Sequence, residues 1–527
     1  MFKVKILSRD VMKKLIILIF PLFLFSQNNY VFGPSIRVND DPPGSSWHSV
    51  RSSGQHGIVC RGDTVYIVFD DERNSSNRYV YFSKSTDAGT TWSPNIRIDG
   101  DLPGIETGGA SITLDAKGWL YVTWMSWEAG NDRNVYFAKS TDGGENFSYP
   151  VIVNDTTRTT QEMPSIAVDS SGQKIFIAWD DTRNPVGFPN YDIYFSRSTD
   201  GGLNFEPSIR VDDTGNDSSW QQIPSIGCTR SGDTIYVAWR DDRNCNGTDN
   251  IDVYFSRSVD GGVSFEPNIL VNDTVGTTWK RQWDPSLWVD NSGTIYIVWD
   301  DGFYPSFAKS IDGGQSFIGE QSVSDTATGG KYPSICSIND SFIYVAWQDQ
   351  RTYSQTGDDI YFSFSSDGGS TFNPNVRVND LEVTEDAWDW DANITVNNDG
   401  KVFVAWDSDR NDIWNWDIYF ATGQYVGIME EVRSQRLEAR LQCYPNPFSK
   451  LINISFSVGR SAKSVGLRIY DVSGRLVRQY DYTTMGLSNY IIWYGDDEQG
   501  HQVPCGIYFV RIKTSNKSVI KKVVKIE

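Results

Sequence analysis

Histidine and cysteine are scarce in this sequence. Its 527 residues include 3 His and 6 Cys, and the spacing of the cysteines gives neither a zinc-binding pattern nor a dense disulfide framework. Cys443 and Cys505 share the C-terminal region, where they can pair or stay free. No phosphate-binding loop and no nucleophile elbow occurs. The sequence therefore predicts no metal and no cofactor.

Long apolar runs are also missing, apart from one near the N-terminus. Lys13 and Lys14 precede the apolar run from Leu15 to Phe25, which is too short to span a bilayer comfortably. This pattern predicts a signal peptide over residues 1–26, and Met12 is an alternative start. No later stretch is apolar enough to cross a membrane, so we expect an exported mature chain without a transmembrane segment.

Positive charge is in short supply over most of the chain. The formal net charge is -20, yet Leu441–Glu527 carries 12 Lys and Arg against 6 Asp and Glu, which leaves -26 for residues 1–440. Such an acidic body argues against nucleic acid and anionic membranes as partners. The contrast with the basic C-terminal part predicts two domains with different roles.

Aromatic residues and glycine, in contrast, are abundant. Aromatics make up 14% of the residues, with 19 Trp, and there are 45 Gly. This composition is typical of many short strands joined by tight turns, so we expect an all-β protein.

One motif, Ser-x-Asp-x-Gly-x-x-aromatic, recurs six times, with its aspartates 52 to 60 residues apart. In a hairpin turn Asp can accept hydrogen bonds from backbone amides, Gly supplies a positive φ, and the aromatic side chain can pack between sheets. The motif aspartates are Asp87, Asp142, Asp200, Asp260, Asp312 and Asp367.

The motif resembles the Asp-box, or BNR repeat, of the sialidase superfamily of β-propellers. The resemblance implies a propeller in which these aspartates are structural and lie away from any active site.

The strands around each motif recur as well. In the third repeat they begin at Pro164, Lys174, Asp192 and Ser208, which makes one four-stranded blade. A seventh set of inner strands, ending near Phe420, lacks its outer strand, whereas Pro34–Asp40 matches an outer strand and precedes every repeat. We therefore predict a seven-bladed propeller over residues 27–422, with the N-terminal strand closing the last blade.

At one end of this propeller, an Asp-Asp-x-Arg-Asn pattern recurs after the second strand of the blades. The arginines could form a ring that recognises carboxylates, or each could join neighbouring loops through its own carboxylate, and the repetition favours the second interpretation. They are Arg73, Arg183, Arg243, Arg351 and Arg410.

The connections between blades share that end, vary in content and carry several tryptophans. These indoles could stack on sugar rings or plug the gaps between blades, and both interpretations stay open. The ligand-binding candidates are Trp47, Trp220, Trp279, Trp283, Trp388 and Trp390.

Sialidase activity, as the resemblance implies it, needs three arginines on the substrate carboxylate, a Tyr nucleophile with a Glu partner, and an Asp acid/base. The first arginine belongs to an Arg-Ile-Pro motif, but here Ile36-Arg37-Val38 lacks the proline, and Arg37 recurs in other outer strands. Tyr332 and a loop carboxylate could form a hydrolytic pair, although spacing selects none of Glu106, Glu162, Glu382, Glu385 and Asp386. Catalytic residues stay unassigned.

The C-terminal region departs from the repeat. Residues 423–440 turn charged, as a linker does, and 441–527 open with Tyr444-Pro-Asn-Pro-Phe448 and continue with Gly506-Ile-Tyr-Phe509 and a basic end. This β-sandwich pattern resembles the C-terminal sorting domain of type IX secretion cargo and the related immunoglobulin-like domain of hook-capping proteins. A plain accessory β-sandwich is the alternative. The resemblance implies type IX secretion machinery as a partner and a secreted or outer-surface location in a Gram-negative type bacterium.

These observations favour a secreted propeller that binds a glycan or a surface protein through its loop-rich end. The alternative is an exo-acting glycoside hydrolase of sialidase type, so the sequence leaves enzymatic activity undecided and leans against it.

Overall fold

The computed structural model describes residues 30–526, except for 51–55, 74–76, 101, 103–104, 129–131, 157–158, 185–189, 216–218, 246–249, 274–280, 328, 381–386, 427–439, 445–446, 458–464, 482–489 and 515–517. The chain divides into two compact units, unit 1 (Met1–Tyr425) and unit 2 (Val426–Glu527). The predicted signal peptide, most of the predicted linker, Trp279, Glu382, Glu385 and Asp386 lie outside the described residues.

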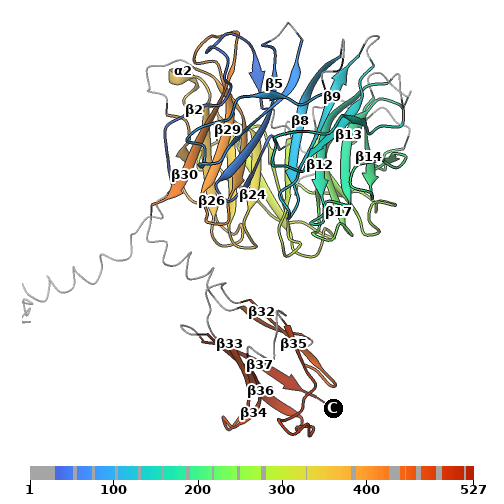
Figure 1. The fold of residues 1–527 in the computed structure, drawn as a ribbon, viewed down its shortest axis with the longest axis vertical. Coiled ribbons are helices and arrows are strands. Elements are labelled where there is room, and N and C mark those ends of the chain that lie inside the picture. Colours follow the sequence, from blue (N-terminus) through green and yellow to red (C-terminus); the bar gives the residue numbers. More distant parts are fainter. Residues whose placement is uncertain are drawn as a thin grey trace, which may run out of the picture. The chain divides into compact units, whose positions relative to one another are not determined.

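Unit 1 is all-β except for one short helix, α2 (Tyr353–Thr356), among its described residues. Those residues form seven antiparallel sheets, numbered here in chain order, and Figure 1 shows them side by side. The inner strands are β4 (Ile58–Arg61), β8 (Glu106–Leu114), β12 (Gln161–Val168), β16 (Gln221–Cys228), β20 (Trp283–Val289), β24 (Gly330–Ser337) and β28 (Asp389–Val396). The second strands are β5 (Thr64–Asp71), β9 (Leu120–Trp127), β13 (Ile175–Asp181), β17 (Ile235–Asp241), β21 (Ile295–Asp300), β25 (Ile343–Asp349) and β29 (Val402–Ser408).

The outer half of each sheet follows the same order. The third strands are β6 (Tyr79–Ser85), β10 (Val135–Ser140), β14 (Asp192–Ser198), β18 (Asp252–Ser258), β22 (Pro305–Ser310), β26 (Asp359–Ser365) and β30 (Asp417–Tyr425). The outer strands of sheets 1 to 6 are β7 (Ile96–Arg97), β11 (Val151–Ile152), β15 (Ile209–Arg210), β19 (Ile269–Leu270), β23 (Ile318–Ser322) and β27 (Val376–Arg377). In sheet 1 a further short strand, β3 (His48–Ser49), also pairs with β5.

The sheets form a closed ring. Inner strands of neighbouring sheets contact each other all the way round, and β28 of sheet 7 contacts β4 of sheet 1. The N-terminal strands β1 (Tyr30–Phe32) and β2 (Ile36–Arg37) both pair with β30, with Ile36 opposite Phe420. The N-terminal strand therefore completes the last sheet, as the sequence predicts, and joins the two ends of the ring with backbone hydrogen bonds.

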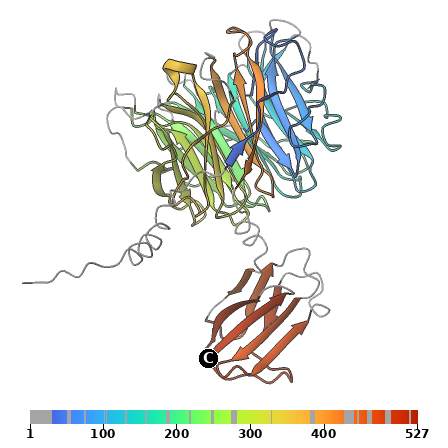
Figure 2. The ribbon, with the colours of Figure 1, turned by 90° about the vertical axis from the view of Figure 1, so that its left-hand side faces the viewer.

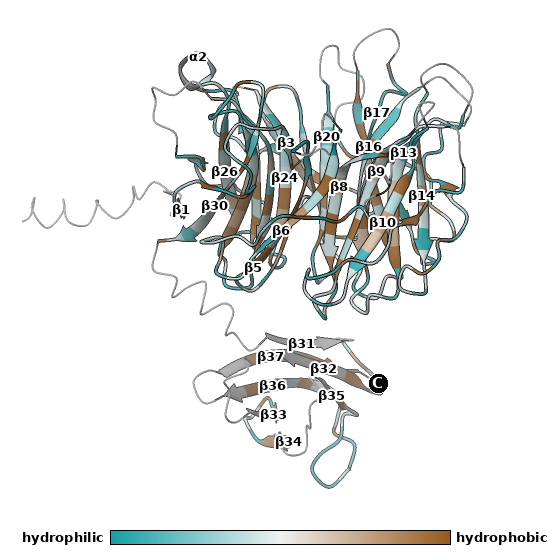
Figure 3. Cartoon of the chain, turned by 45° about the horizontal axis from the view of Figure 1, so that its top comes forward, coloured by the Kyte–Doolittle hydropathy of each residue, from teal (hydrophilic) through white to brown (hydrophobic). Residues whose placement is uncertain are grey.

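The core lies between neighbouring sheets. Figure 3 shows the hydrophobic stretches inside the strands, and the second strands of sheets 2 to 7 each bury one Trp completely. Phe69 takes that position in sheet 1. Ile67 and Phe69 of sheet 1 share a core with Phe403 and Phe420 of sheet 7, so a hydrophobic core spans the join between the first and last sheets.

Each Asp-box motif forms a tight turn between the third and outer strands. In the second repeat Ser140 Oγ donates to Asp142 Oδ1 at 2.8 Å, and the amides of Glu145 and Asn146 donate to the same oxygen at 3.1 and 3.0 Å. The closing aromatic of each motif packs edge-on against an aromatic of the preceding sheet, as Phe147 does on Phe82 at 5.1 Å. These contacts fix the turn and join two sheets, which is a structural role.

Unit 2 contains two antiparallel sheets, shown in orange and red in Figure 2. One holds β31 (Arg440–Tyr444), β32 (Ile452–Ser457) and β35 (Tyr490–Trp493); the other holds β33 (Val465–Asp471), β34 (Leu476–Asp481), β36 (Gly506–Thr514) and β37 (Ser518–Lys525). Buried side chains of both sheets, with Trp493 and Phe448 among them, form one core. Cys505 is an exposed free cysteine. No helix in the described part of the chain is long and apolar enough to cross a membrane.

Candidate functional site

The inner strands of sheets 2 to 7 share a bulge near their first residues. In sheet 5, for example, the register between β20 and β21 shifts between Trp283 and Ser286. One residue of each bulge has a left-handed backbone, with φ between +47° and +64°: Gly109, Met163, Ile223, Asp284, Tyr332 and Asp391. A side chain other than glycine is strained there, and such strain persists where the surrounding structure enforces it, often at functional sites.

Sheets 5, 6 and 7 carry polar groups at this strained position, and two more polar side chains lie beside them. The inner-strand cluster consists of Arg240, Asp284, Asp300, Tyr332 and Asp391. The charges of Asp284 and Asp391 act on each other and on Tyr332, although these three residues belong to three different sheets. The cluster therefore converges from several strands, at the end of the sheets opposite the Asp-box turns.

Asp284 is the most unusual member of the cluster. Its side chain is 3% exposed, and its Oδ1 has no hydrogen-bond partner among the described residues. Arg240 Nη1 lies 3.7 Å from that oxygen, which is an ion-pair distance but too long for a hydrogen bond. Burial raises the pKa of Asp284 to about 6, with Arg240 opposing the shift and Asp391 adding to it. The carboxyl is thus desolvated, with one oxygen lacking a hydrogen-bond donor and the Arg240 charge compensating only in part.

The rest of the cluster shares this low-dielectric, acidic setting. Burial raises the pKa of Asp300 to about 7, and the charge of Asp284 contributes. Burial also raises the pKa of the Tyr332 hydroxyl, and Asp284 and Asp391 act in the same direction. Tyr332 and Asp391 are half-buried, so they remain partly in contact with solvent. Perturbed pKa values grouped on partly exposed residues are a signature of functional sites.

Two of the predicted tryptophans flank the cluster. Trp283 directly precedes Asp284, and the Arg240 guanidinium lies 4.8 Å from the centre of its ring. Trp390 directly precedes Asp391 and packs against Trp388 at 5.7 Å. Both indoles are half-buried. Sheets 5 and 7 therefore present the same Trp-Asp pair at the same repeat position.

The remaining tryptophan candidates do not join this group in the described structure. Trp47 lies against Arg78, whose guanidinium is 4.3 Å from its ring centre. Trp220 is 43% exposed and precedes the inner strand of sheet 4.

The carboxylates proposed from the sequence as partners of Tyr332 are placed differently. Glu162 forms an ion pair with Arg133, and Glu106 starts the inner strand of sheet 2. The carboxylates whose charges act on Tyr332 are Asp284, Asp391 and Asp300. A comparison of repeats could have found two of them, since Trp283-Asp284 and Trp390-Asp391 occupy the position held by Glu162-Met163 and Gln222-Ile223.

The recurrent arginines join neighbouring loops. Arg243 binds both carboxylate oxygens of Asp241 at 3.0 and 2.7 Å, reaches Asp213 of the preceding sheet at 2.7 Å, and lies 4.0 Å from the Tyr254 ring centre. Arg73, Arg183 and Arg351 repeat this pattern, and Arg410 bonds Ser408 where the others have Asp. Because most of their donors are committed to these partners, these five arginines do not offer a clamp for a substrate carboxylate.

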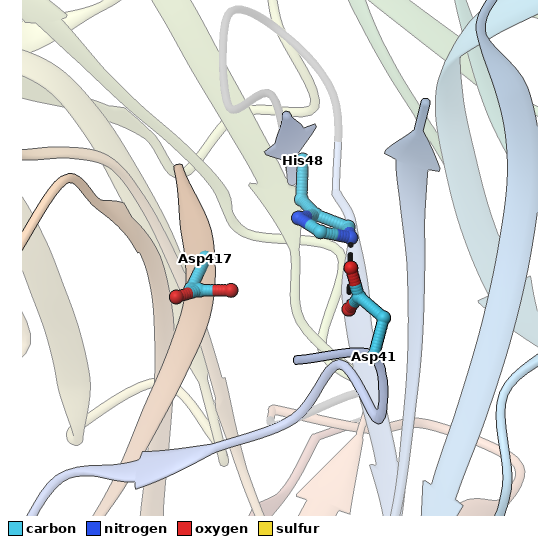
Figure 4. Close-up of side chains that lie close together, drawn as sticks. All are labelled: Asp41, His48 and Asp417. Carbon is cyan, nitrogen blue, oxygen red and sulfur yellow. Dashed lines mark ion pairs between the residues drawn. The ribbon is translucent and has the colours of Figure 1, made fainter. Parts of the chain in front are cut away.

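Asp41, His48 and Asp417 form the one grouping in the described chain whose spacing suits a metal ion (Figure 4). His48 Nδ1 hydrogen-bonds the Trp416 carbonyl at 2.8 Å, and its Nε2 lies 3.3 Å from both Asp41 and Asp71. Burial lowers the pKa of His48, but the two nearby aspartates outweigh it and raise the pKa to about 9. Asp417 already accepts hydrogen bonds from Asn39 and Asn411. A protonated histidine between carboxylates accounts for this group without a metal.

A cavity of about 390 Å³ lies at the other end of the inner strands. Its carboxylates are already saturated, as Asp115 shows by accepting hydrogen bonds from the amides of Lys117 and Trp119 and from the Tyr121 hydroxyl. His56 crosses to sheet 5, where its Nε2 lies 3.3 Å from the Leu287 carbonyl. The two ends therefore differ, and the end with the inner-strand cluster is the stronger candidate.

Solved structures similar to this chain include several carbohydrate-active proteins. A Penicillium chrysogenum alpha-L-arabinanase complexed with arabinobiose is 13% identical, with 60% of this chain and 94% of that chain covered and a TM-score of 0.45. A protein of unknown function from Dyadobacter fermentans is 13% identical over 75% and 99%, with a TM-score of 0.44. The Hadza microbial sialidase Hz136 is 14% identical over 67% and 73%, with a TM-score of 0.42. These likenesses are too distant to transfer a function.

No curated protein matches the chain. Residues 442–527, in contrast, match the family model described as a secretion system C-terminal sorting domain. Unit 2 is thus a sorting domain of this family, and the chain is secreted and placed at the outer surface of a Gram-negative type bacterium.

Proposed function

We propose that unit 1 binds a carbohydrate at the end of the sheets that carries the inner-strand cluster. The observation that carries this proposal is the buried Asp284 carboxylate, whose Oδ1 has no hydrogen-bond donor in the described structure. A buried carboxylate oxygen without a hydrogen-bond donor is costly even beside the Arg240 charge, and a ligand hydroxyl that donates to it would lower that cost. The flanking Trp283 and Trp390 offer ring faces on which a sugar ring can stack.

Binding measurements on the full chain test this proposal. Titration calorimetry against a panel of oligosaccharides should identify a ligand, and Asp284→Ala should weaken it by about 10- to 100-fold, the range for a hydrogen bond to a charged group. Asp142→Ala, at the Asp-box end, is the matched control and should bind like the wild type. A ligand that Asp284→Ala binds unchanged would exclude this site, and a protein ligand captured without any carbohydrate would replace the proposal.

Glycoside hydrolysis is a second candidate, favoured by the pKa of Asp284. A carboxyl with a pKa of about 6 can hold a proton for a leaving oxygen near neutral pH, and Asp391 is a second carboxylate, whose charge acts on Asp284. Released reducing ends, measured between pH 4 and 8 on every carbohydrate that binds, would reveal turnover. Loss of turnover in Asp284→Asn with binding retained supports hydrolysis, whereas binding without any product leaves a binding protein.

A further inference from the structure

In sheets 1 and 3, the residue that follows the buried aromatic of the second strand reaches the strained position of the next sheet. Asp70 Oδ1 and Oδ2 accept hydrogen bonds from the Gly109 amide at 2.9 and 3.0 Å. Asp180 Oδ1 accepts one from the Ile223 amide at 2.8 Å. Each of these contacts joins a carboxylate to a backbone amide, so it stabilises the strained backbone whatever side chain the strained residue carries.

Sheet 4 has an arginine at this position, and the arginine faces a side chain. Arg240 follows the buried Trp239, and its Nη1 lies 3.7 Å from Oδ1 of Asp284, the strained residue of sheet 5. A guanidinium has no hydrogen-bond acceptor, so Arg240 cannot make the carboxylate–amide contact of sheets 1 and 3. Two positions of the repeat therefore differ together, and the result is an arginine beside a carboxylate.

The protein holds the Arg240 side chain beside Asp284. Arg240 Nη2 donates to Gln222 Oε1 at 2.7 Å, and the guanidinium lies 4.8 Å from the centre of the Trp283 ring. Gln222 and Trp283 directly precede the strained residues of sheets 4 and 5. The side chains of Arg240 and Asp284 are 19% and 3% exposed, so water and salt screen their ion pair less than a surface pair.

Several charged groups surround this pair. The charge of Asp391 disfavours ionisation of Asp284, as burial does, and the charge of Arg240 opposes both. Arg240 also acts through its charge on Asp180 and Tyr332, whereas its one ion pair among the described residues is with Asp284. Arg240 is therefore placed to favour the ionised form of Asp284 above that of the other groups near it.

Lys331 is another cation close to the inner-strand cluster. Its charge acts on two other carboxyl groups, Asp300 and Asp358. Asp300 is linked to Asp284, because the charge of Asp284 raises the pKa of Asp300. The charges that act on Asp284 itself are those of Arg240 and Asp391, so Arg240 is the cation that favours its ionised form.

We propose that Arg240 is a positioning residue of the candidate carbohydrate site and holds the Asp284 carboxylate in the ionised form that accepts a hydrogen bond from a ligand hydroxyl. This inference rests on the proposed function and specifies how pH regulates the site. Without Arg240 the carboxyl would keep its proton to a higher pH, because burial and Asp391 would act unopposed. A protonated carboxyl is a weaker acceptor, so binding would then weaken near neutral pH.

Urea unfolding of the full-length protein between pH 4 and 9 tests this inference without a ligand. The excess stability of Asp284→Asn over the chain that keeps Asp284 grows with pH until the carboxyl is ionised in the folded protein. With Arg240 present, this excess should level off as the pH rises past about 6. In the Arg240→Gln background it should keep growing over about one further pH unit, which makes the final ratio of unfolding constants about 10-fold larger.

The repeat itself supplies suitable variants. Gln348 and Met125 occupy the position of Arg240 in sheets 6 and 2, so Arg240→Gln and Arg240→Met introduce side chains that this position accommodates, and the second replaces the first if the first does not fold. Arg240→Lys keeps the charge and should leave the pH range of the excess unchanged. Arg243→Gln is the matched control in the same sheet. It removes ion pairs with Asp241 and Asp213, so it should lower stability without moving the pH range.

Binding measurements then connect the ionisation of Asp284 to the ligand. Calorimetry with the tightest-binding oligosaccharide of the panel should show that Arg240→Gln weakens binding more at pH 6.5 than at pH 8.5, because the carboxyl regains its charge at the higher pH. Arg243→Gln should show no such difference between the two pH values.

The outcomes separate this inference from the proposed function. A pH range of the excess that does not move in Arg240→Gln or Arg240→Met overturns the inference, since a purely structural arginine costs the same stability with or without Asp284→Asn. An equal shift in Arg243→Gln overturns it as well. If no oligosaccharide binds the wild type, the proposed function is wrong, while the urea measurements still decide whether Arg240 holds Asp284 ionised.

Discussion

Aspartates at the two ends of the propeller sheets have opposite environments. At the Asp-box end Asp142 accepts hydrogen bonds from Ser140, Glu145 and Asn146, and these donors lower its pKa to about 2. At the other end Asp284 is buried with one oxygen lacking a hydrogen-bond donor, and burial raises its pKa to about 6. The same residue type therefore stabilises a turn in one place and is only partly compensated in the other, because Asp284 is desolvated by burial and has fewer hydrogen-bond donors than Asp142.

Repetition separates the two ends as well. The Asp-box is the same in six sheets because each copy performs the same local task. The strained inner-strand position varies from Met163 and Ile223 to Asp284, Tyr332 and Asp391, so among the described residues only sheets 5 to 7 place polar groups there. A position that keeps its backbone conformation while its side chain changes in polarity and size is where a repeat protein can add function without altering the fold.

The largest expected loss of stability tests whether close packing stabilises the Asp-box end of the sheets. Gly144 has φ +84°, and a Cβ there would lie 2.4 Å from Phe82, so Gly144→Ala should destabilise unit 1 by about 3 kcal/mol or more. Gly143 has φ +75° with open space around it, so Gly143→Ala should cost only about 1–2 kcal/mol. Urea unfolding followed by tryptophan fluorescence measures both. If the two variants lost equal free energy of unfolding, backbone strain alone, without the clash against Phe82, would explain the loss.

The next effect tests the opposite end, where removing a charge should stabilise the fold. An unfolded aspartate loses its proton near pH 3.8, whereas Asp284 keeps it up to about 6, so wild-type stability falls as the pH rises through that window. The side chain of Asp284→Asn cannot ionise. The free energy of unfolding of this variant should therefore exceed that of the wild type by roughly 1–3 kcal/mol at pH 7 and equal it below about pH 4. Urea midpoints across this pH range measure the difference. A variant less stable than the wild type at pH 7 would mean that Asp284 is compensated in solution.

A third, similar or smaller effect concerns sheet 1, where His48 and Phe69 replace the Gln and Trp of sheets 3 and 4. Because the pKa of His48 rises from 6.5 to about 9 between Asp41 and Asp71, its stabilisation is complete below pH 6.5 and is lost as the pH rises through 9. His48→Gln introduces the residue type that Gln161 and Gln221 provide in sheets 3 and 4. This variant should lower the free energy of unfolding by about 1–3 kcal/mol at pH 6 and by little above pH 9.5. Thermal unfolding at pH 6, 7.5 and 9.5 measures this trend. A cost that does not change with pH would contradict a charged His48.

The sequence predicted much of the fold because its signals are local. Alternation of apolar residues, turn glycines and the recurring Asp-box each act within a few residues, and the match between Pro34–Asp40 and other outer strands sufficed to pair β2 with β30. The candidate site was harder to predict. Trp283, Trp388, Trp390 and Tyr332 stood out as side-chain types, but nothing local indicated which carboxylates would face them.

Two features of this protein were determined by its sequence alone: an all-β repeat, and a C-terminal domain that directs secretion. Tertiary structure decided the rest, because the charges of Asp284 and Asp391 act on Tyr332 only when strands from three sheets converge. Tyr332 is 48 residues from Asp284 and 59 from Asp391 in the chain. It also decided that the recurrent arginines are bound to protein carboxylates, since a guanidinium is available to a ligand only where folding leaves it without such a partner. Strand patterns are set by neighbours in sequence, whereas desolvation and charge are set by neighbours in space.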